Sequence, residues 1–155
     1  ISNIGLYYAQ PLTEKNVKVK LSDVSVKDWK TVGMPAEAAN AIDGDPQTVW
    51  TAKALTPLVV DMGKASEVIG FSYAPAQKED LTGTIYKYNF YVSIDGKNWT
   101  KCDAGGEFSN IMHNPVPYFV RFGKKYPARY FKLEPVAEIN NKPATTVGEV
   151  GILLK

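Results

Sequence analysis

Hydrophobic and polar residues alternate along much of this chain, and the alternation predicts short β-strands. Residues 84–93 are the clearest case. One face of that strand is expected to carry four large side chains: Tyr86, Tyr88, Phe90 and Val92. Ile85 and Tyr91 are exceptions to the pattern, but a period of two still indicates a half-buried strand. The Asp-Gly turn at 95–98 then predicts a hairpin leading into Trp99.

Similar alternation predicts further strands along the chain. They are expected at 58–62, 68–73 (with Ile69, Phe71 and Tyr73 on one face), 118–122, 130–134 and 150–154, with weaker candidates at 17–21 and 24–31. One short stretch, 36–42, has a helix-like pattern. Many short strands separated by turns are typical of an antiparallel β-sandwich or barrel. We expect a lead-in segment or edge strand at 1–23 and a single domain at 24–155.

Composition and charge narrow the classes of function. The chain has 155 residues and a formal net charge of +2, with Lys and Arg spread along it. That distribution argues against nucleic-acid binding, and no apolar run is long enough to predict membrane insertion. The only cysteine, Cys102, cannot form an internal disulfide. A start at Ile1 without Met predicts a piece of a longer protein.

The segment 38–50 concentrates oxygen-bearing side chains on a turn. Asn40, Asp43, Asp45 and Thr48 fall within nine residues around Gly44. Hard oxygen ligands crowded on a turn suggest calcium, although an Asp-Gly turn capped only by hydrogen bonds gives the same pattern. An EF-hand is excluded, because the twelfth position counted from Asp43 is Ala54 and not Glu. Near the end of the chain, Glu149 could meet this loop if the terminal strands lie side by side.

Six motifs in sequence order resemble one known family. They lie at 39–50, 58–63, 70–73, 88–99, 128–133 and 147–150. Together they resemble the discoidin domain, also called the coagulation factor V/VIII type C or galactose-binding-like domain. Residues 106–111, followed by 114–115, are similar to carbohydrate-binding module family thirty-two, as appended to bacterial α-L-fucosidases and β-hexosaminidases (chitobiases). The resemblance implies an all-β, eight-stranded, jelly-roll-like antiparallel sandwich that is an accessory domain and not a catalyst.

The resemblance also implies a structural calcium ion. Its ligands would be carboxylates of Asp43 and Glu149, carbonyl oxygens of Asn40, Asp45 and Gly148, and the carbonyl and hydroxyl of Thr48. Two formal negative charges would balance one Ca²⁺, and the ion would tie the two ends of the domain together.

Four loops are expected to hold a ligand, at 33–38, 51–56, 73–83 and 137–146, because the loops of a sandwich bind while its strands give a rigid frame. Sugars need amide or cationic donors beside an apolar surface. The candidate carbohydrate-binding residues are Lys53, Gln77, Lys78, Asn140 and Asn141, with Met34 or Ile139 as apolar contacts. Sugar-binding relatives often carry an Arg just after the Pro that corresponds to Pro75, and here that position is Ala76.

Several single residues are assigned to packing or to the surface. We expect Trp29 and Trp50 to pack in the sandwich, Trp99 to face the core, Cys102 to be buried, and Lys124–Lys125 to form a solvated turn. His113, the only histidine, is expected in a surface loop.

We therefore expect a non-catalytic, monomeric carbohydrate-binding module of a secreted glycoside hydrolase. Its partners would be glycans of the galactose, GalNAc, GlcNAc or fucose type. The resemblance also implies a secreted, periplasmic or cell-surface location. The alternative is a structural domain that packs on the catalytic domain of its parent enzyme, which the Ala at position 76 favours. A free-standing enzyme is disfavoured, because no catalytic pattern surrounds His113 or Cys102.

Overall fold

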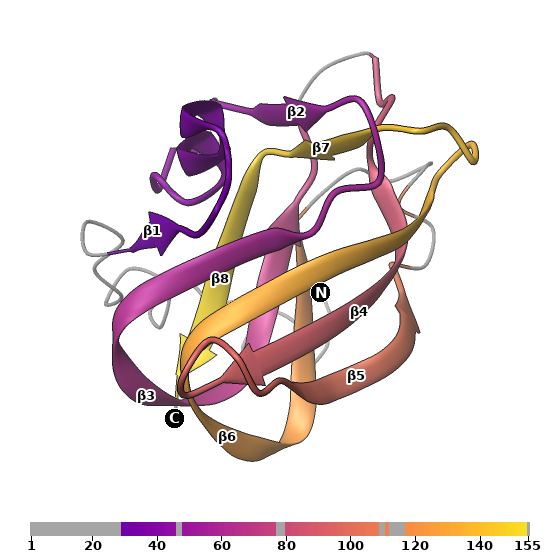
Figure 1. Ribbon diagram of the computed structural model, residues 1–155. Coiled ribbons are helices and arrows are strands. Elements are labelled where there is room, and N and C mark those ends of the chain that lie inside the picture. Colours follow the sequence, from indigo (N-terminus) through magenta and orange to yellow (C-terminus); the bar gives the residue numbers. More distant parts are fainter. Residues whose placement is uncertain (1–28, 46–47, 77–79, 109–110, 112–116, 155) are drawn as a thin grey trace, which may run out of the picture.

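The computed structural model describes residues 29–45, 48–76, 80–108, 111 and 117–154. Most of them lie in antiparallel strands, with one short 3₁₀ helix (Figure 1). The elements are β1 (Lys30–Thr31), η2 (Ala36–Ala41), β2 (Trp50–Ala52), β3 (Leu58–Ala74), β4 (Ile85–Ser93), β5 (Thr100–Glu107), β6 (Tyr118–Glu138), β7 (Thr145–Val147) and β8 (Glu149–Leu154). The candidate strand at 17–21, Gln77, Lys78 and His113 lie outside the described residues. No helix in the described part of the chain is long and apolar enough to cross a bilayer.

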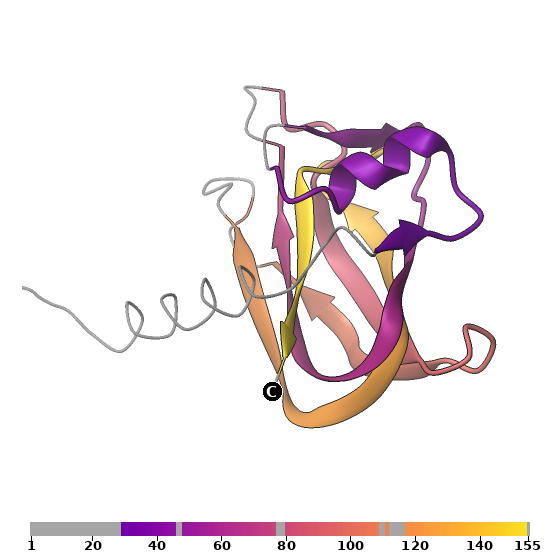
Figure 2. The same cartoon turned by 90° about the vertical axis from the view of Figure 1, so that its left-hand side faces the viewer.

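Two long bent strands, β3 and β6, run through both layers of the sandwich (Figures 1 and 2). The first part of β3 pairs with the second part of β6, and β1 and β4 extend that layer on either side, with β5 beyond β4. After a register shift between Asp61 and Ser66, the rest of β3 pairs with the first part of β6 and with β8. The all-β sandwich expected from the sequence is confirmed.

A separate two-stranded sheet, β2 with β7, closes one end of the sandwich. Trp50 pairs with Val147 and Ala52 with Thr145. This pairing brings the chain after η2 beside the chain that enters β8. In Figure 1 it lies at the top of the molecule, together with η2.

Aromatic rings from both layers fill the core. Phe71 on β3 stacks on Phe90 of β4 with 4.2 Å between ring centroids, and Phe90 in turn lies 5.7 Å from Phe131 on β6. Trp29 meets Phe131 edge to face and is only 8% exposed, and Trp50 is 2% exposed. The packing expected of Trp29 and Trp50 is therefore confirmed.

Register shifts change which residues face the core. Ile85, an exception to the predicted alternation, is buried, whereas Tyr86 is half-buried and donates its hydroxyl hydrogen to Glu107. The pairing of β4 with β6 shifts on both sides of Lys87, and such irregularities turn side chains to the other face. A shift between Val68 and Gly70 likewise leaves Val68 in the core and Ile69 only half-buried.

Three further expectations were wrong. Trp99 does not join the buried core; it is half-buried, and the Lys132 ammonium lies 4.7 Å from its ring. Cys102 is also only half-buried; it packs against the core from β5, the last strand along the described path of its sheet. Lys124 and Lys125 are exposed, but they lie within β6 and not in a turn.

Candidate functional site

The loop after η2 is fixed at its base by burial and by one amide. Ala38, Ala41 and Ile42 are buried, so the apolar side of this short helix is anchored in the core. At the end of η2, Asn40 donates an Nδ2 hydrogen to the carbonyl oxygen of Val49 at 3.1 Å. The bond joins the two ends of the segment 40–49, which we call the acidic loop.

Oxygen atoms of the acidic loop converge on the hydroxyl of Thr48. Its Oγ1 lies 3.3 Å from the carbonyl oxygen of Asn40 and 2.9 Å from that of Asp45, and it also contacts Oδ2 of Asp43. A hydroxyl has one hydrogen to donate. Several acceptor oxygens around a single donor form a set that is electron-rich and suited to a cation.

The loop meets the start of β8, as the sequence analysis required. The Gly44 N–H donates to Oε2 of Glu149 at 2.9 Å, and Gly44 has the left-handed φ of +81° that glycine tolerates. The loop and β8 are brought together in a different way from the one expected, because β1 and β8, the first and last strands of the described residues, do not pair with each other. Both pair with β3, while the β2–β7 pair carries the chain to this meeting point.

Gly148 permits a close approach beside this point. Its N–H donates to the carbonyl oxygen of Ala74 at 2.8 Å. A Cβ at position 148 would lie 2.8 Å from the carbonyl oxygen of Pro75 and 2.9 Å from that of Ala74, closer than real Cβ contacts. Glycine therefore lets the backbone before Glu149 lie against the end of β3.

Glu149 is a largely buried carboxyl group, and only one of its two oxygens accepts a hydrogen bond from a backbone N–H. Burial raises its pKa to about 8; the Gly44 N–H opposes the rise, and the negative charges of Asp43 and Asp45 add to it. Its Oε1 is buried and has no hydrogen-bond partner among the described residues. A buried carboxylate oxygen of this kind requires a proton or a cation.

These observations fit a divalent cation of the calcium type. Calcium takes six to eight oxygen ligands, including carboxylates, hydroxyls and main-chain carbonyls. Among the residues that the structure describes, no three His, Cys, Asp or Glu side chains are placed to hold one metal ion. The predicted ligand set does not need such a trio, since only Asp43 and Glu149 would supply carboxylates.

Three of the four predicted ligand loops are tied together at the same end of the sandwich. Thr145 on β7 donates its hydroxyl hydrogen to the carbonyl oxygen of Ala54 at 2.8 Å and accepts the N–H of Thr56 at 2.9 Å. Next to it, Thr146 donates its N–H to the carbonyl oxygen of Gly83 at 2.8 Å. Loops 51–56, 73–83 and 137–146 thus share β7 as a common frame.

A buried carboxylate, Glu138, shapes the loop between β6 and β7. Glu138 is 2% exposed, and three backbone N–H groups donate to it. Gly83 donates to Oε2 at 2.8 Å, while Asn140 and Lys142 donate to Oε1 at 2.6 and 3.0 Å. Asn141 between them has a φ of +59° and is exposed. Glu138 therefore fixes a strained turn that presents two asparagine amides.

The remaining predicted sugar contacts lie in different surroundings. Lys53 is exposed on the loop after β2, beside the loops that β7 holds. Met34 and Ile139 are partly buried and pack against the core, and the Met34 sulfur accepts the N–H of Val59 at 3.4 Å. Ala76 is only 2% exposed and offers no donor group.

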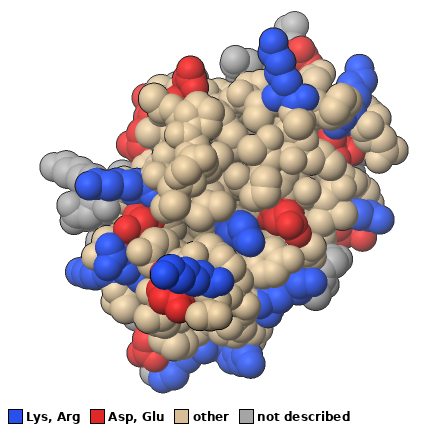
Figure 3. Space-filling view, viewed as in Figure 1, with Lys and Arg blue, Asp and Glu red and all other residues tan. Residues whose placement is uncertain are grey.

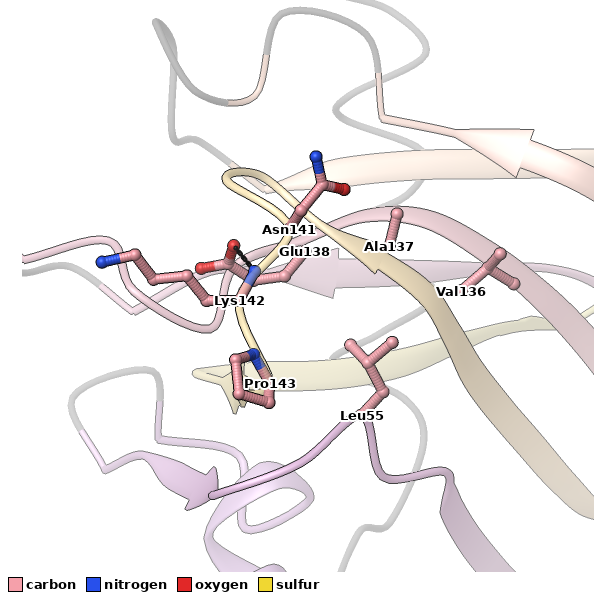
Figure 4. A pocket seen from close by; sticks show the side chains of 7 residues that line it. All are labelled: Leu55, Val136, Ala137, Glu138, Asn141, Lys142 and Pro143. Atoms are coloured by element: carbon pink, nitrogen blue, oxygen red, sulfur yellow. Dashed lines mark hydrogen bonds between the residues drawn. The ribbon is translucent and has the colours of Figure 1, made fainter.

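A shallow groove of about 400 Å³ lies beside Asn141 (Figure 4). It is lined by Leu55, Val136, Ala137, Glu138, Asn141, Lys142 and Pro143. The sequence analysis missed Val136, and it included Leu55 and Pro143 only as members of the predicted loops 51–56 and 137–146, because no sequence pattern shows that the loop after β2 lies beside the end of β6. The role of Glu138 was missed for the same reason: its partner Gly83 is 55 residues away.

With this geometry established, comparison with known families decides the assignment. Residues 20–150 match the family model described as the F5/8 type C domain. The chain belongs to the F5/8 type C domain family. The family resemblance identified in the sequence is thereby confirmed, and the matched range includes the last four residues of the predicted lead-in segment, 20–23.

A curated relative of this chain is a much longer protein. The chain is 29% identical over 143 residues to a galactose oxidase of Gibberella zeae (strain PH-1), covering 84% of this chain and 20% of that protein. It thus spans about a fifth of the length of this curated relative.

Solved structures share the fold. The module CpGH89CBM32-5 of Clostridium perfringens, in complex with GalNAc-β-1,3-galactose, aligns with a TM-score of 0.71 at 22% identity, covering 84% of this chain and 98% of that one. The C-terminal domain of a chitobiase from Bacteroides fragilis aligns with a TM-score of 0.67 at 22% identity, covering 84% and 96%.

Proposed function

We propose that this F5/8 type C domain is a non-catalytic carbohydrate-binding module of a larger, secreted or cell-surface glycoside hydrolase. One observation carries the proposal: loops 51–56, 73–83 and 137–146 are held at one end of the sandwich, where exposed amides adjoin an apolar groove. That combination suits a sugar, which has hydroxyl edges and an apolar surface. The structural neighbour that binds GalNAc-β-1,3-galactose has the same fold.

The module would bind weakly and act through proximity. A shallow loop-end surface buries little of a ligand, so its benefit would come from raising the concentration of the attached enzyme near its substrate. We expect terminal galactose, GalNAc, GlcNAc or fucose units as ligands, and a module that works as a monomer.

We further propose a structural calcium ion in the acidic loop. Asn40, Asp43, Asp45, Thr48, Gly148 and Glu149 would hold it. Bound there, calcium would neutralise the negative charge of the Glu149 carboxylate and would join the acidic loop to β8. The uncompensated Oε1 of Glu149 and the oxygens around Thr48 support this assignment.

Sugar binding is tested by a glycan array followed by calorimetric titration with galactose, GalNAc, GlcNAc and fucose. Asn141→Ala and Lys53→Ala should each weaken binding at least several-fold, because each removes an exposed donor at the loop end. Lys64→Ala, which removes an exposed lysine from β3 and not from the loops, is the matched control. A silent array and flat titrations would contradict the proposal.

Calcium is tested separately by elemental analysis and by melting with and without EDTA. We expect one calcium per chain and a lower melting temperature after chelation. Glu149→Gln should greatly reduce the difference, because it removes one of the two carboxylate charges that would balance the calcium ion. Melting and metal content that chelation leaves unchanged would exclude the ion.

A second function, packing on a parent enzyme, is favoured by one observation. Position 76 carries a buried Ala where sugar-binding relatives often carry an Arg. If sugar binding has been lost, removing this domain from its parent protein should lower the stability of the catalytic domain. That result, with a silent glycan array, would replace the first proposal.

A further inference from the structure

The groove beside Asn141 is lined by aliphatic and not by aromatic side chains. Its apolar lining consists of Leu55, Val136, Ala137 and Pro143. Leu55 is 41% exposed and Val136 is 47% exposed, which places them among the few large hydrophobic side chains on the surface of the described residues. Two such side chains in the lining of one groove form a small apolar patch that a ligand could cover.

The two charged residues of the lining, Glu138 and Lys142, present little charge to a ligand in the groove. Both oxygens of Glu138 already accept backbone N–H groups. In Figure 4 the Lys142 side chain extends away from Leu55 and Val136, and the Asn141 amide points away from Leu55. The groove therefore offers an apolar surface with a neutral amide beside it, which matches an uncharged ligand.

Aliphatic and aromatic surfaces favour different parts of a sugar. An aromatic ring offers a flat face on which a pyranose can lie. An aliphatic groove offers no such face, but it stabilises a compact hydrocarbon group, since burial of apolar surface is non-directional. A hydroxyl group placed there would lose its hydrogen bonds to water without finding a partner.

We propose that this groove is a subsite for the methyl group of a sugar. The methyl would be that of the acetamido group of an N-acetylhexosamine or the C6 methyl of a 6-deoxyhexose. The inference rests on the proposed carbohydrate-binding function and narrows its ligand class. The position of Asn141 supports the proposal. Asn141 is an exposed candidate sugar-binding residue and also lines the groove, so one sugar unit can contact the candidate sugar site and the groove together.

The test compares sugars that differ at the methyl group. The wild-type domain is titrated with N-acetylgalactosamine against N-formylgalactosamine, which keeps the amide but lacks the methyl, and with L-fucose against L-galactose. At least one methyl-bearing sugar should bind about fourfold more tightly than its counterpart, the equivalent of ~0.8 kcal/mol for one buried carbon group. The pair that shows the preference identifies which methyl is bound.

Variants locate the preference in the groove. Leu55→Ala and Val136→Ala should each reduce it to less than about twofold, and both positions are exposed enough for the domain to stay folded, which melting curves verify. Val32→Ala is the control, because Val32 is 44% exposed and does not line the groove. In methyl NMR spectra, signals of Leu55 and Val136 should shift on addition of the preferred sugar.

The outcomes separate this inference from the broader function. Equal affinities within both pairs, or a preference that both variants retain, would overturn the methyl subsite and leave sugar binding intact. Absence of binding to all four sugars would overturn both.

Discussion

At the scale of single residues, Thr48 and Glu149 show two signs of a candidate cation position. Thr48 brings one hydroxyl near several oxygens, and Glu149 is a buried carboxyl whose Oε1 has no partner among the described residues. The sequence indicated both residues, because hard oxygen ligands on a turn are a local pattern. Glu138 has no such pattern, since its partners become visible only when two loops are folded together.

A residue-scale prediction concerns the ion pair between Asp61 and Arg129. Two guanidinium nitrogens of Arg129 lie 2.8 and 3.0 Å from the two carboxylate oxygens of Asp61, and this bond holds the pKa of Asp61 below its ordinary value. The pair therefore contributes stability above pH of about 4, and the contribution disappears as the pH falls through the lowered pKa. Asp61→Asn should cost about 1 kcal/mol or less near pH 6, because both side chains of the pair are partly exposed to solvent.

The measurement is urea unfolding of wild type and Asp61→Asn between pH 6 and pH 2.5. The difference in unfolding free energy should shrink as the pH falls. A difference that stays constant or grows toward low pH would show that the ion pair is not its source.

At the scale of elements, the strands follow hydrophobic alternation except where the register shifts. The sequence predicted the position of β4 and its hairpin turn well, but it placed Ile85 on the polar face. Ile85 is in fact buried, whereas Tyr86 packs against the core only in part. Alternation assumes one residue per step, whereas the shifts around Lys87 change the count. A register shift depends on how β4 pairs with β6, which only the folded structure shows. The sequence of β4 alone could therefore not correct this error.

The corrected faces give a paired prediction. Ile85→Ala should destabilise the domain by ~2–5 kcal/mol, because it leaves a cavity in the core. Tyr86→Ala should cost clearly less, because Tyr86 is half-buried and bonds an exposed carboxylate. Chemical unfolding of both variants checks the order, and a reversed order would restore the simple alternating strand.

The β6–β7 loop gives a second prediction at this scale. Glu138→Ala leaves three backbone N–H groups without their acceptor, so it should lower the unfolding free energy by at least ~2 kcal/mol. Glu138→Gln keeps one acceptor oxygen and should lose less.

Hydrogen exchange localises the effect of the Glu138 variants. The amides of Gly83, Asn140 and Lys142 should exchange faster in Glu138→Ala, while that of Phe90 in the core of β4 should be affected only through the global change in stability. Unchanged exchange at those three amides would show that Glu138 does not hold the loop.

At the scale of the whole molecule, the acidic loop and β8 join distant parts of the chain. The bond between Gly44 and Glu149 spans 105 residues. If calcium binds there, it binds only the folded domain, so each tenfold rise in free calcium above the dissociation constant should add ~1.4 kcal/mol to the unfolding free energy.

Melting curves over a series of buffered calcium concentrations measure that dependence, with magnesium as the comparison ion. Magnesium should have a smaller effect, because it demands smaller and more regular octahedral geometry. A melting temperature independent of calcium, or equally raised by magnesium, would contradict a selective calcium site.

The shared strands β3 and β6 have a consequence for a domain tethered in a larger protein. Because each belongs to both faces of the shell, the two faces cannot be peeled apart as separate sheets. A pull on the chain ends loads β1 and β8 first, and because both pair with β3, the strand shared by the two faces bears the load. Under mechanical load, such a tether would give way in one step rather than lengthen gradually.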